Sequence, residues 1–171
     1  MKPALLKSVV LCLGLVASGL WAQAAMAADS ANGKLVVGGK SVLLKHVYAY
    51  MEKTSDGRDG VIILLSDAPV SPAVVQNGYA RKKLVSAGTL HYVELFIASG
   101  KQIHYEVQHQ GFGRMLEPGG DDSEHVLEVK VADGKTVAGR ARTTTPQKSF
   151  DDVTYSYDVT FIAAVAAAKQ N

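Results

Sequence analysis

The chain has 171 residues, of which 47% are hydrophobic, with a single cysteine and a formal net charge of +2. This length is sufficient for one domain with a sizeable buried core. The low net charge argues against nucleic acid or an anionic membrane surface as a partner, because both attract strongly cationic proteins.

The first 27 residues have the pattern of a secretory signal. Lys2 and Lys7 provide a short positive start, residues 9–20 form an apolar core, and residues 25–27 supply the small side chains that signal peptidase requires. The apolar stretch is too short to span a bilayer as a permanent anchor. We therefore expect a periplasmic or secreted protein with no stable membrane anchor after cleavage.

The remaining segment, residues 28–171, is expected to form one domain. Removing the signal deletes two of the 18 basic residues and none of the 16 acidic ones, which leaves the mature chain formally neutral. It also removes Cys12, so we expect no disulfide, no thiol chemistry and no lipid attachment. A cut after Ala24 would move the start by three residues and change none of these expectations.

Most of this segment has the hydrophobic pattern of β-strands. Hydrophobic side chains recur mostly at every second position, in eight stretches bounded by turn residues. The eight stretches are residues 34–37, 41–52, 60–66, 89–98, 102–108, 124–131, 136–143 and 153–165. Residues 61–65 are apolar without alternation, which indicates a strand covered on both faces.

Only residues 71–87 have the features of a helical segment. Pro72 suits the first turn of a helix, Gly88 can end the last one, and Asn77-Gly78 predicts a break between them. The basic run at residues 81–83 is expected to lie on a solvated face of this segment.

About eight strands and one short helical crossover predict an all-β fold made of two packed antiparallel sheets. An immunoglobulin-like β-sandwich is the nearest architecture, although the cysteine and tryptophan signature of antibody domains is missing. A small closed β-barrel is the alternative.

One predicted hairpin brings titratable side chains together. A three-residue loop at residues 98–100 places the odd-numbered side chains from His91 to Val107 in the core and the even-numbered ones outside. It also places Glu94 opposite His104, and Tyr92 opposite Glu106. A two-residue loop would mix the two faces.

The outward side chains Tyr92, Glu94, His104 and Glu106 form the first candidate site. Imidazole and carboxylate groups can hold a divalent metal ion, and together with the phenol they can bind a polar ligand. The simpler interpretation is a solvated sheet face with one weak cross-strand pair.

Two further segments are candidate contact regions. Residues 110–124 form the longest irregular segment, and Phe112, Arg114 and Met115 within it are residue types that anchor interfaces. Residues 140–149 form the second segment, with three basic side chains that could form the rim of a site for an acidic partner.

The sequence contains no pattern of a known catalytic site. It lacks a GxSxG motif and metal-ligand spacing, and it has no cysteine after the signal. We therefore expect a non-enzymatic binding or interaction module of the bacterial cell envelope, without a cofactor, whose partner is a protein or a small polar ligand. The alternatives are a metal-binding protein or metal-dependent enzyme that uses Glu94, His104 and Glu106, and a structural envelope protein.

Overall fold

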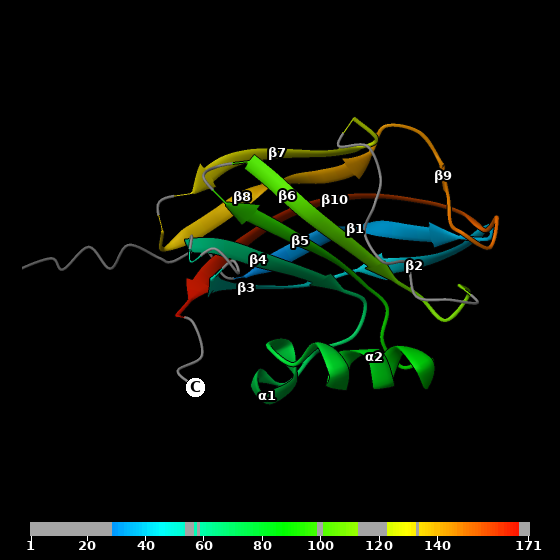
Figure 1. The fold of residues 1–171 in the computed structure, drawn as a ribbon, viewed down its shortest axis with the longest axis horizontal. Helices are drawn as coiled ribbons and strands as arrows, with labels where there is room; N and C mark the ends of the chain where they lie inside the picture. The colour runs from blue at the N-terminus through cyan, green and yellow to red at the C-terminus, as the bar shows by residue number, and fades with distance from the viewer. Residues whose placement is uncertain are drawn as a thin grey trace, which may run out of the picture.

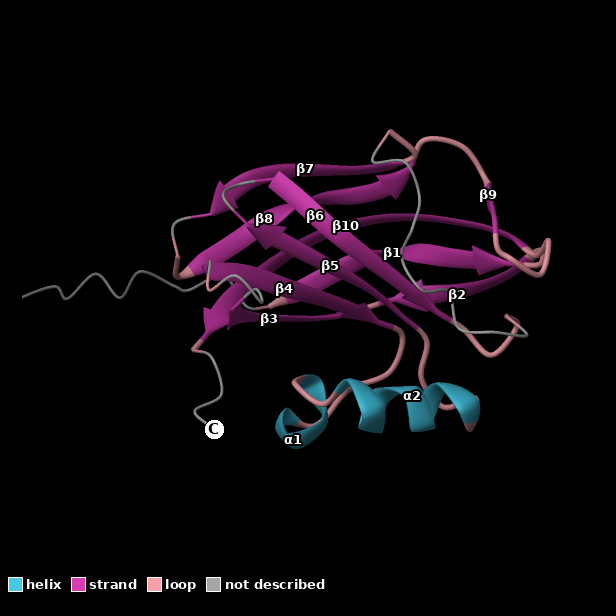
Figure 2. Cartoon of the chain, viewed as in Figure 1, coloured by secondary structure: helices cyan, strands magenta, loops and turns pink. Residues whose placement is uncertain are grey.

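The computed structural model describes residues 29–53, 57, 59–98, 101–112, 123–132 and 134–167. The predicted signal therefore lies outside the described residues. Most of the described chain is in strands, and two short helices lie together on one side of them (Figures 1 and 2). No described helix is long and apolar enough to cross a membrane.

The elements follow one another in the order in which Figure 1 labels them. Their bounds are β1 (Ser30–Val37), β2 (Lys40–Leu44), β3 (His46–Lys53), β4 (Asp59–Ser66), α1 (Pro72–Val75), α2 (Gly78–Ser86), β5 (Tyr92–Ala98), β6 (Lys101–Gln108), β7 (His125–Ala132), β8 (Thr136–Thr143), β9 (Gln147–Lys148) and β10 (Thr154–Ala166).

The strands form one mixed sheet of ten strands in which β10 occupies the central place. We call the strands in the order β2-β1-β10-β8-β7, with β10 in the middle, the first half-sheet. The end of β10 also pairs with β3, which begins the second half-sheet, in the order β3-β4-β5-β6. The contact between β10 and β3 is parallel and short, at Val165 with Ala49 and Ala166 with Tyr50, whereas the other pairings are antiparallel.

Strand β10 alternates as the sequence predicts. Tyr155, Tyr157, Val159, Phe161 and Ala163 are all buried, at 5% exposure or less. They point into the main core, which also receives side chains from both half-sheets. One face of each half-sheet thus covers a single apolar interior.

A second, smaller core lies beneath the helices. Ile62 and Leu64 of β4 point toward it, together with Val75 of α1 and Val85 of α2, while Ile63 of β4 belongs to the main core. Strand β4 is therefore covered on both faces, which confirms the interpretation of its continuous apolar run.

The helical segment contains the expected break. Helix α1 ends at Val75 and α2 begins at Gly78, with Asn77 as its N-cap. The Asn77 side chain accepts a hydrogen bond from the Ala80 amide at 3.0 Å. This cap explains why the break falls where Asn-Gly occurs in the sequence.

The predicted strand at residues 41–52 is two strands. The chain leaves the first half-sheet after Leu44 and enters the second at His46, so β2 and β3 belong to different halves. Between them, the Lys45 amide donates to the Ser66 carbonyl at 2.9 Å. The inward parity changes at this corner, because Leu44 of β2 and Val47 of β3 both enter the main core. The even-numbered Tyr48 of β3 packs against the second core beneath the helices instead.

The described strands do not close into a barrel, so that alternative is wrong. Among these strands, β2, β6 and β7 each have only one hydrogen-bonded neighbour, which leaves the sheet open. An immunoglobulin-like sandwich is not confirmed. In an immunoglobulin domain the strands are divided between two separate sheets, whereas here β10 pairs with strands of both halves.

The predicted hairpin between β5 and β6 has the correct faces but the wrong register. Ala98 pairs with Lys101, so two residues connect the strands where three were expected. A bulge between Phe96 and Ile97 then shifts the ladder by one residue. Because the shift restores the parity, Tyr105 and Val107 are buried in the main core as predicted.

Two glycines allow neighbouring strands to approach closely in the first half-sheet. A Cβ atom on Gly33 of β1 would lie 2.1 Å from the Asp158 carbonyl oxygen and 2.5 Å from the Val159 Cα atom of β10. A Cβ atom on Gly139 of β8 would lie 2.4 Å from the Glu128 carbonyl oxygen of β7. Backbone atoms cannot move aside as side chains do, so these positions require glycine.

We expect Gly33→Ala to lower the free energy of unfolding by at least about 2 kcal/mol, because the added methyl group forces β1 away from β10. Urea denaturation measures this change. Gly78→Ala is the matched control, since its Cβ atom would meet only the end of the Arg81 side chain at 3.8 Å. Equal stability of the two variants would contradict the proposed close approach.

Candidate functional site

The first candidate site is divided between buried and exposed positions. Tyr92 is fully buried and Glu94 is 8% exposed, because α2 covers this face of β5. Glu106 is half-buried and accepts a hydrogen bond from the Tyr92 hydroxyl at 2.9 Å. His104 is exposed.

The predicted cross-strand pairs are corrected by the observed register. Glu94 lies opposite Glu106, His104 lies opposite Phe96, and Tyr92 lies opposite Gln108. Tyr92 reaches Glu106 as a diagonal neighbour. The two-residue connection and the bulge described above account for the difference, since each displaces the partner of every residue beyond it by one.

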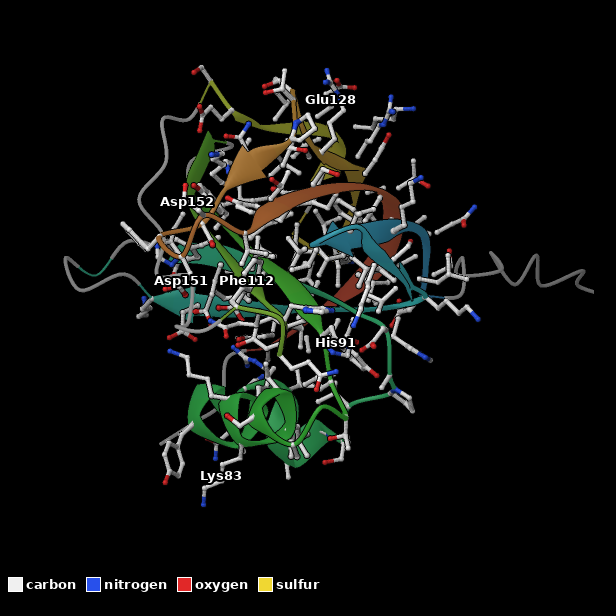
Figure 3. All side chains as sticks on the ribbon, turned by 90° about the vertical axis from the view of Figure 1, so that its right-hand side faces the viewer. Lys83, His91, Phe112, Glu128, Asp151 and Asp152 are labelled. Atoms are coloured by element: carbon white, nitrogen blue, oxygen red, sulfur yellow. The ribbon has the colours of Figure 1, made fainter. Side chains whose placement is uncertain are left out.

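Arg81 of α2 occupies the space above these residues. Its guanidinium donates to the Glu94 carboxylate and to the Val75 carbonyl, and its Cζ atom lies 5.3 Å from the centre of the Tyr92 ring. Arg81 is only 4% exposed, so the expectation of a solvated basic run is wrong at this residue. Figure 3 shows Lys83 on the side of α2 that faces away from the sheet.

Burial is the largest cause of the pKa shifts of the acidic side chains around Arg81. It raises the pKa of the Glu94 carboxyl, and the Arg81 guanidinium opposes that shift. Burial, with the Glu94 charge adding to it, raises the pKa of Tyr50 to about 12. Burial and the nearby Glu106 carboxylate raise the pKa of Tyr92 as well. Both phenols therefore stay protonated at neutral pH.

Arg81 already serves as the cation for the Glu94 carboxylate. Within the described residues there is no group of three or more His, Cys, Asp or Glu side chains that could hold a metal ion. Tyr92 and Glu94 are also screened from solvent by α2. The structure thus gives this cluster a clear role in joining the helices to the sheet.

Phe112 is part of the core, contrary to the expectation of an exposed contact residue. It is 8% exposed, and its ring meets the rings of His109 and Tyr155 edge to face, at centroid distances of 6.1 and 5.7 Å. Arg114 and Met115 lie outside the described residues.

Two buried histidines lie next to one another near Phe112. His91 is held by Asp67, which contacts both its ring Nδ1 at 2.6 Å and its backbone amide at 2.7 Å. The His109 ring packs on the His91 ring at a centroid distance of 4.2 Å. Burial and the neighbouring His91 lower the pKa of His109 to about 4.

A third buried histidine links the open edges of the two half-sheets. His125 of β7 stacks on Tyr105 of β6 at a centroid distance of 3.4 Å. Its two ring nitrogens contact the hydroxyls of Tyr157 at 3.0 Å and Tyr155 at 3.3 Å. Burial lowers the pKa of His125 to about 4, so the ring is neutral at physiological pH.

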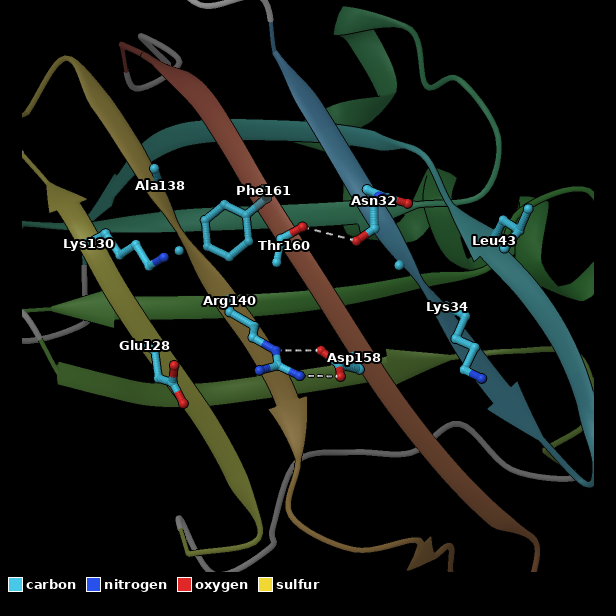
Figure 4. A pocket seen from close by; sticks show the side chains of 12 residues that line it. Asn32, Lys34, Leu43, Glu128, Lys130, Ala138, Arg140, Asp158, Thr160 and Phe161 are labelled. Atoms are coloured by element: carbon cyan, nitrogen blue, oxygen red, sulfur yellow. Dashed lines mark hydrogen bonds and ion pairs between the residues drawn. The ribbon is translucent and has the colours of Figure 1, made fainter.

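An open hollow of about 770 Å³ lies on the outer face of the first half-sheet (Figure 4). We call it the outer hollow. Its lining comes from β1, β2, β7, β8 and β10 and consists of Asn32, Gly33, Lys34, Leu43, Glu128, Lys130, Ala138, Gly139, Arg140, Asp158, Thr160 and Phe161. Figure 3 shows Glu128, one of these residues, on the side of the molecule away from the helices.

The centre of the outer hollow is a paired charge. Arg140 donates to both carboxylate oxygens of Asp158, at 2.8 and 2.6 Å, and this contact holds the pKa of Asp158 below its usual range. The two side chains remain 42% and 47% exposed. A pair this exposed contributes little to stability, but it presents charged groups in a fixed geometry.

The outer hollow continues into a smaller one of about 190 Å³, because Lys34 and Asp158 line both. The smaller hollow adds hydroxyl groups from residues 143–145 and from Ser156. The second contact segment that the sequence indicated, residues 140–149, supplies Arg140 to the outer hollow and residues 143–146 to the smaller one. Two later members of that segment, Gln147 and Ser149, are buried.

We expect Arg81→Met and Glu94→Met each to lower the free energy of unfolding by about 3 to 5 kcal/mol, because each leaves a buried charge without its partner. The double variant should lose less than the two single losses combined, since it leaves neither charge behind. Urea denaturation of all three gives the coupling, with exposed Lys83→Met as the control. Additive losses would contradict the pairing.

We expect stability to fall as the pH drops from 6.5 toward 4. His109 and His125 have folded-state pKa values of about 4, below the ordinary value near 6.5, so the unfolded chain binds more protons in this window. Between pH 6.5 and pH 5 each of these two histidines should lower the free energy of unfolding by about 1 to 2 kcal/mol. The slope of unfolding free energy against pH should shrink in His109→Gln and persist in His46→Gln.

In comparisons with known proteins, no family model matches the chain, and neither does a curated protein or a solved structure. Any function must therefore be argued from the geometry of its surfaces. The outer hollow is open and carries several charged side chains, with Phe161 of the main core in its lining, whereas the buried cluster around Arg81 is closed by α2.

Proposed function

We propose that the protein is a non-enzymatic binding module of the bacterial cell envelope, which uses the outer hollow to hold a polar ligand. The signal-like pattern of residues 1–27 supports export.

The observation that carries this proposal is the outer hollow itself. Five strands line it, and charged or polar side chains predominate in the lining. Concave surfaces with several convergent polar groups are common ligand sites. The hollow also lies where the fold tolerates polar side chains, on the face opposite the main core.

We further infer that the two half-sheets act as the layers of an open β-sandwich. Support comes from the main core, which takes Leu35 of β1 and Tyr157 of β10 from one half and Ile63 of β4 and Val107 of β6 from the other. A rigid two-layered scaffold would keep the outer hollow in a constant shape.

We expect Ala138→Trp to abolish binding, because the indole ring would project into the outer hollow and obstruct it without changing any charge. The measurement is co-sedimentation of the purified protein with isolated cell-envelope material. Ala73→Trp, on an exposed position of α1, is the control and should bind normally. Undiminished sedimentation of Ala138→Trp, with an unchanged unfolding midpoint, would refute the proposal.

A further inference from the structure

The outer hollow carries more positive than negative charge. Lys34, Lys130 and Arg140 face Glu128 and Asp158 in its lining. Arg142 adds a further cation at the border, where it donates to Glu128 at 3.2 Å. The described side chains here thus include four cations and two carboxylates, although the mature chain as a whole is formally neutral.

Among the described side chains of the hollow, the two lysines are the cations without an ion pair at hydrogen-bond distance, and Lys34 lies near enough to Asp158 to help lower its pKa. Arg140 is engaged by Asp158 and Arg142 by Glu128, whereas Lys34 and Lys130 are exposed. Figure 4 shows them on opposite sides of the Arg140–Asp158 pair. Lys130 falls at the register shift between Val129 and Val131 of β7, and bulges of this kind redirect a side chain.

The spacing of the lysines excludes a single small anion as the full occupant. Strands β7, β8, β10 and β1 are consecutive neighbours, so β7 and β1 lie about 14 Å apart, or three strand spacings. The registers place Lys34 across from Val126, four residues before Lys130 along β7, so the two lysines are further apart than this. A ligand that engages both ammonium groups must carry acidic groups at intervals. The smaller hollow beyond Lys34 extends the surface further and adds hydroxyl groups.

The location of the hollow indicates which class of polymeric ligand can bind in it. Its centre lies over β1, β10 and β8, whose backbones are already paired with neighbours on both sides, and only its borders are formed by the open edges β2 and β7. An extended peptide that crosses the Arg140–Asp158 pair therefore cannot join as an additional strand, which is its usual way of binding a sheet. Recognition must come from side-chain ammonium, hydroxyl and amide groups, which match the carboxylates and hydroxyls of an acidic sugar polymer.

We infer that the ligand of the outer hollow is a polysaccharide that carries repeated carboxylate groups, held by Lys34 and Lys130 across the Arg140–Asp158 pair. This inference rests on the proposed binding function. Since the lysines act as exposed charges, added salt should weaken the complex by screening.

Isothermal titration of the purified protein with polygalacturonate tests the inference. We expect binding that weakens at least tenfold in Lys34→Gln/Lys130→Gln and also weakens as sodium chloride is raised. The matched control is Lys82→Gln/Lys83→Gln on α2, which removes the same charge elsewhere and should bind as the original protein does. Unchanged unfolding midpoints would establish that the variants are folded.

Polyglutamate and a neutral glucan are the competing probes. Polyglutamate binding as tight as that of polygalacturonate would overturn the inference in favour of an acidic peptide, and equal binding of the glucan would overturn the requirement for charge. No binding of polygalacturonate would overturn it as well. If envelope binding is lost in Ala138→Trp but kept in Lys34→Gln/Lys130→Gln, the binding function stands and only the acidic-polysaccharide inference fails.

Discussion

Backbone hydrogen bonds along the 13 residues of β10 tie the two half-sheets into one structure. Its register with β1 runs from Tyr155 opposite Val37 to Ile162 opposite Ser30. Its other edge pairs with β9 and β8, and its end meets β3. The alternation of β10 divides its side chains between the main core and the outer hollow. Both the interior and the proposed binding surface therefore depend on this one strand keeping its register.

In the second half-sheet a buried ion pair holds helix α2 against the strands. Its outer face carries Tyr92 and Glu94 beside apolar residues, and α2 covers this face with Arg81 directed at the carboxylate. A buried pair of this kind adds little net stability, because desolvation offsets much of the attraction. It does fix the position of the helix, since any other placement would leave both charges unpaired.

The alternation of apolar and polar residues in the sequence predicted those features of the fold that depend only on which side chains are buried. The alternation in β10, the inward set from Val93 to Val107 and the two-sided burial of β4 follow directly from side-chain polarity. The two-residue connection and the bulge after Phe96 were missed because together they preserve the parity of the pattern while they change the partners. The corner at Lys45 was missed because the aromatic side chains of β3 that face the helices continue the apolar alternation of β2, although the inward face changes from even to odd positions. Arg81 was misplaced because a charged residue in a short helix gives no local sign of a buried carboxylate from another element.

The same reasoning explains why the candidate site moved from one half-sheet to the other. Sequence alone distinguishes the two faces of a strand but does not reveal which outer face a helix will cover. Once α1 and α2 lie over β3, β4 and β5, the polar side chains there become partners of the helices. The outward side chains of β1, β8 and β10 have no such covering layer among the described elements, and glycines at positions 33 and 139 let these strands approach closely. Charged groups that the fold does not need for its own stability are then left facing solvent, where a ligand can reach them.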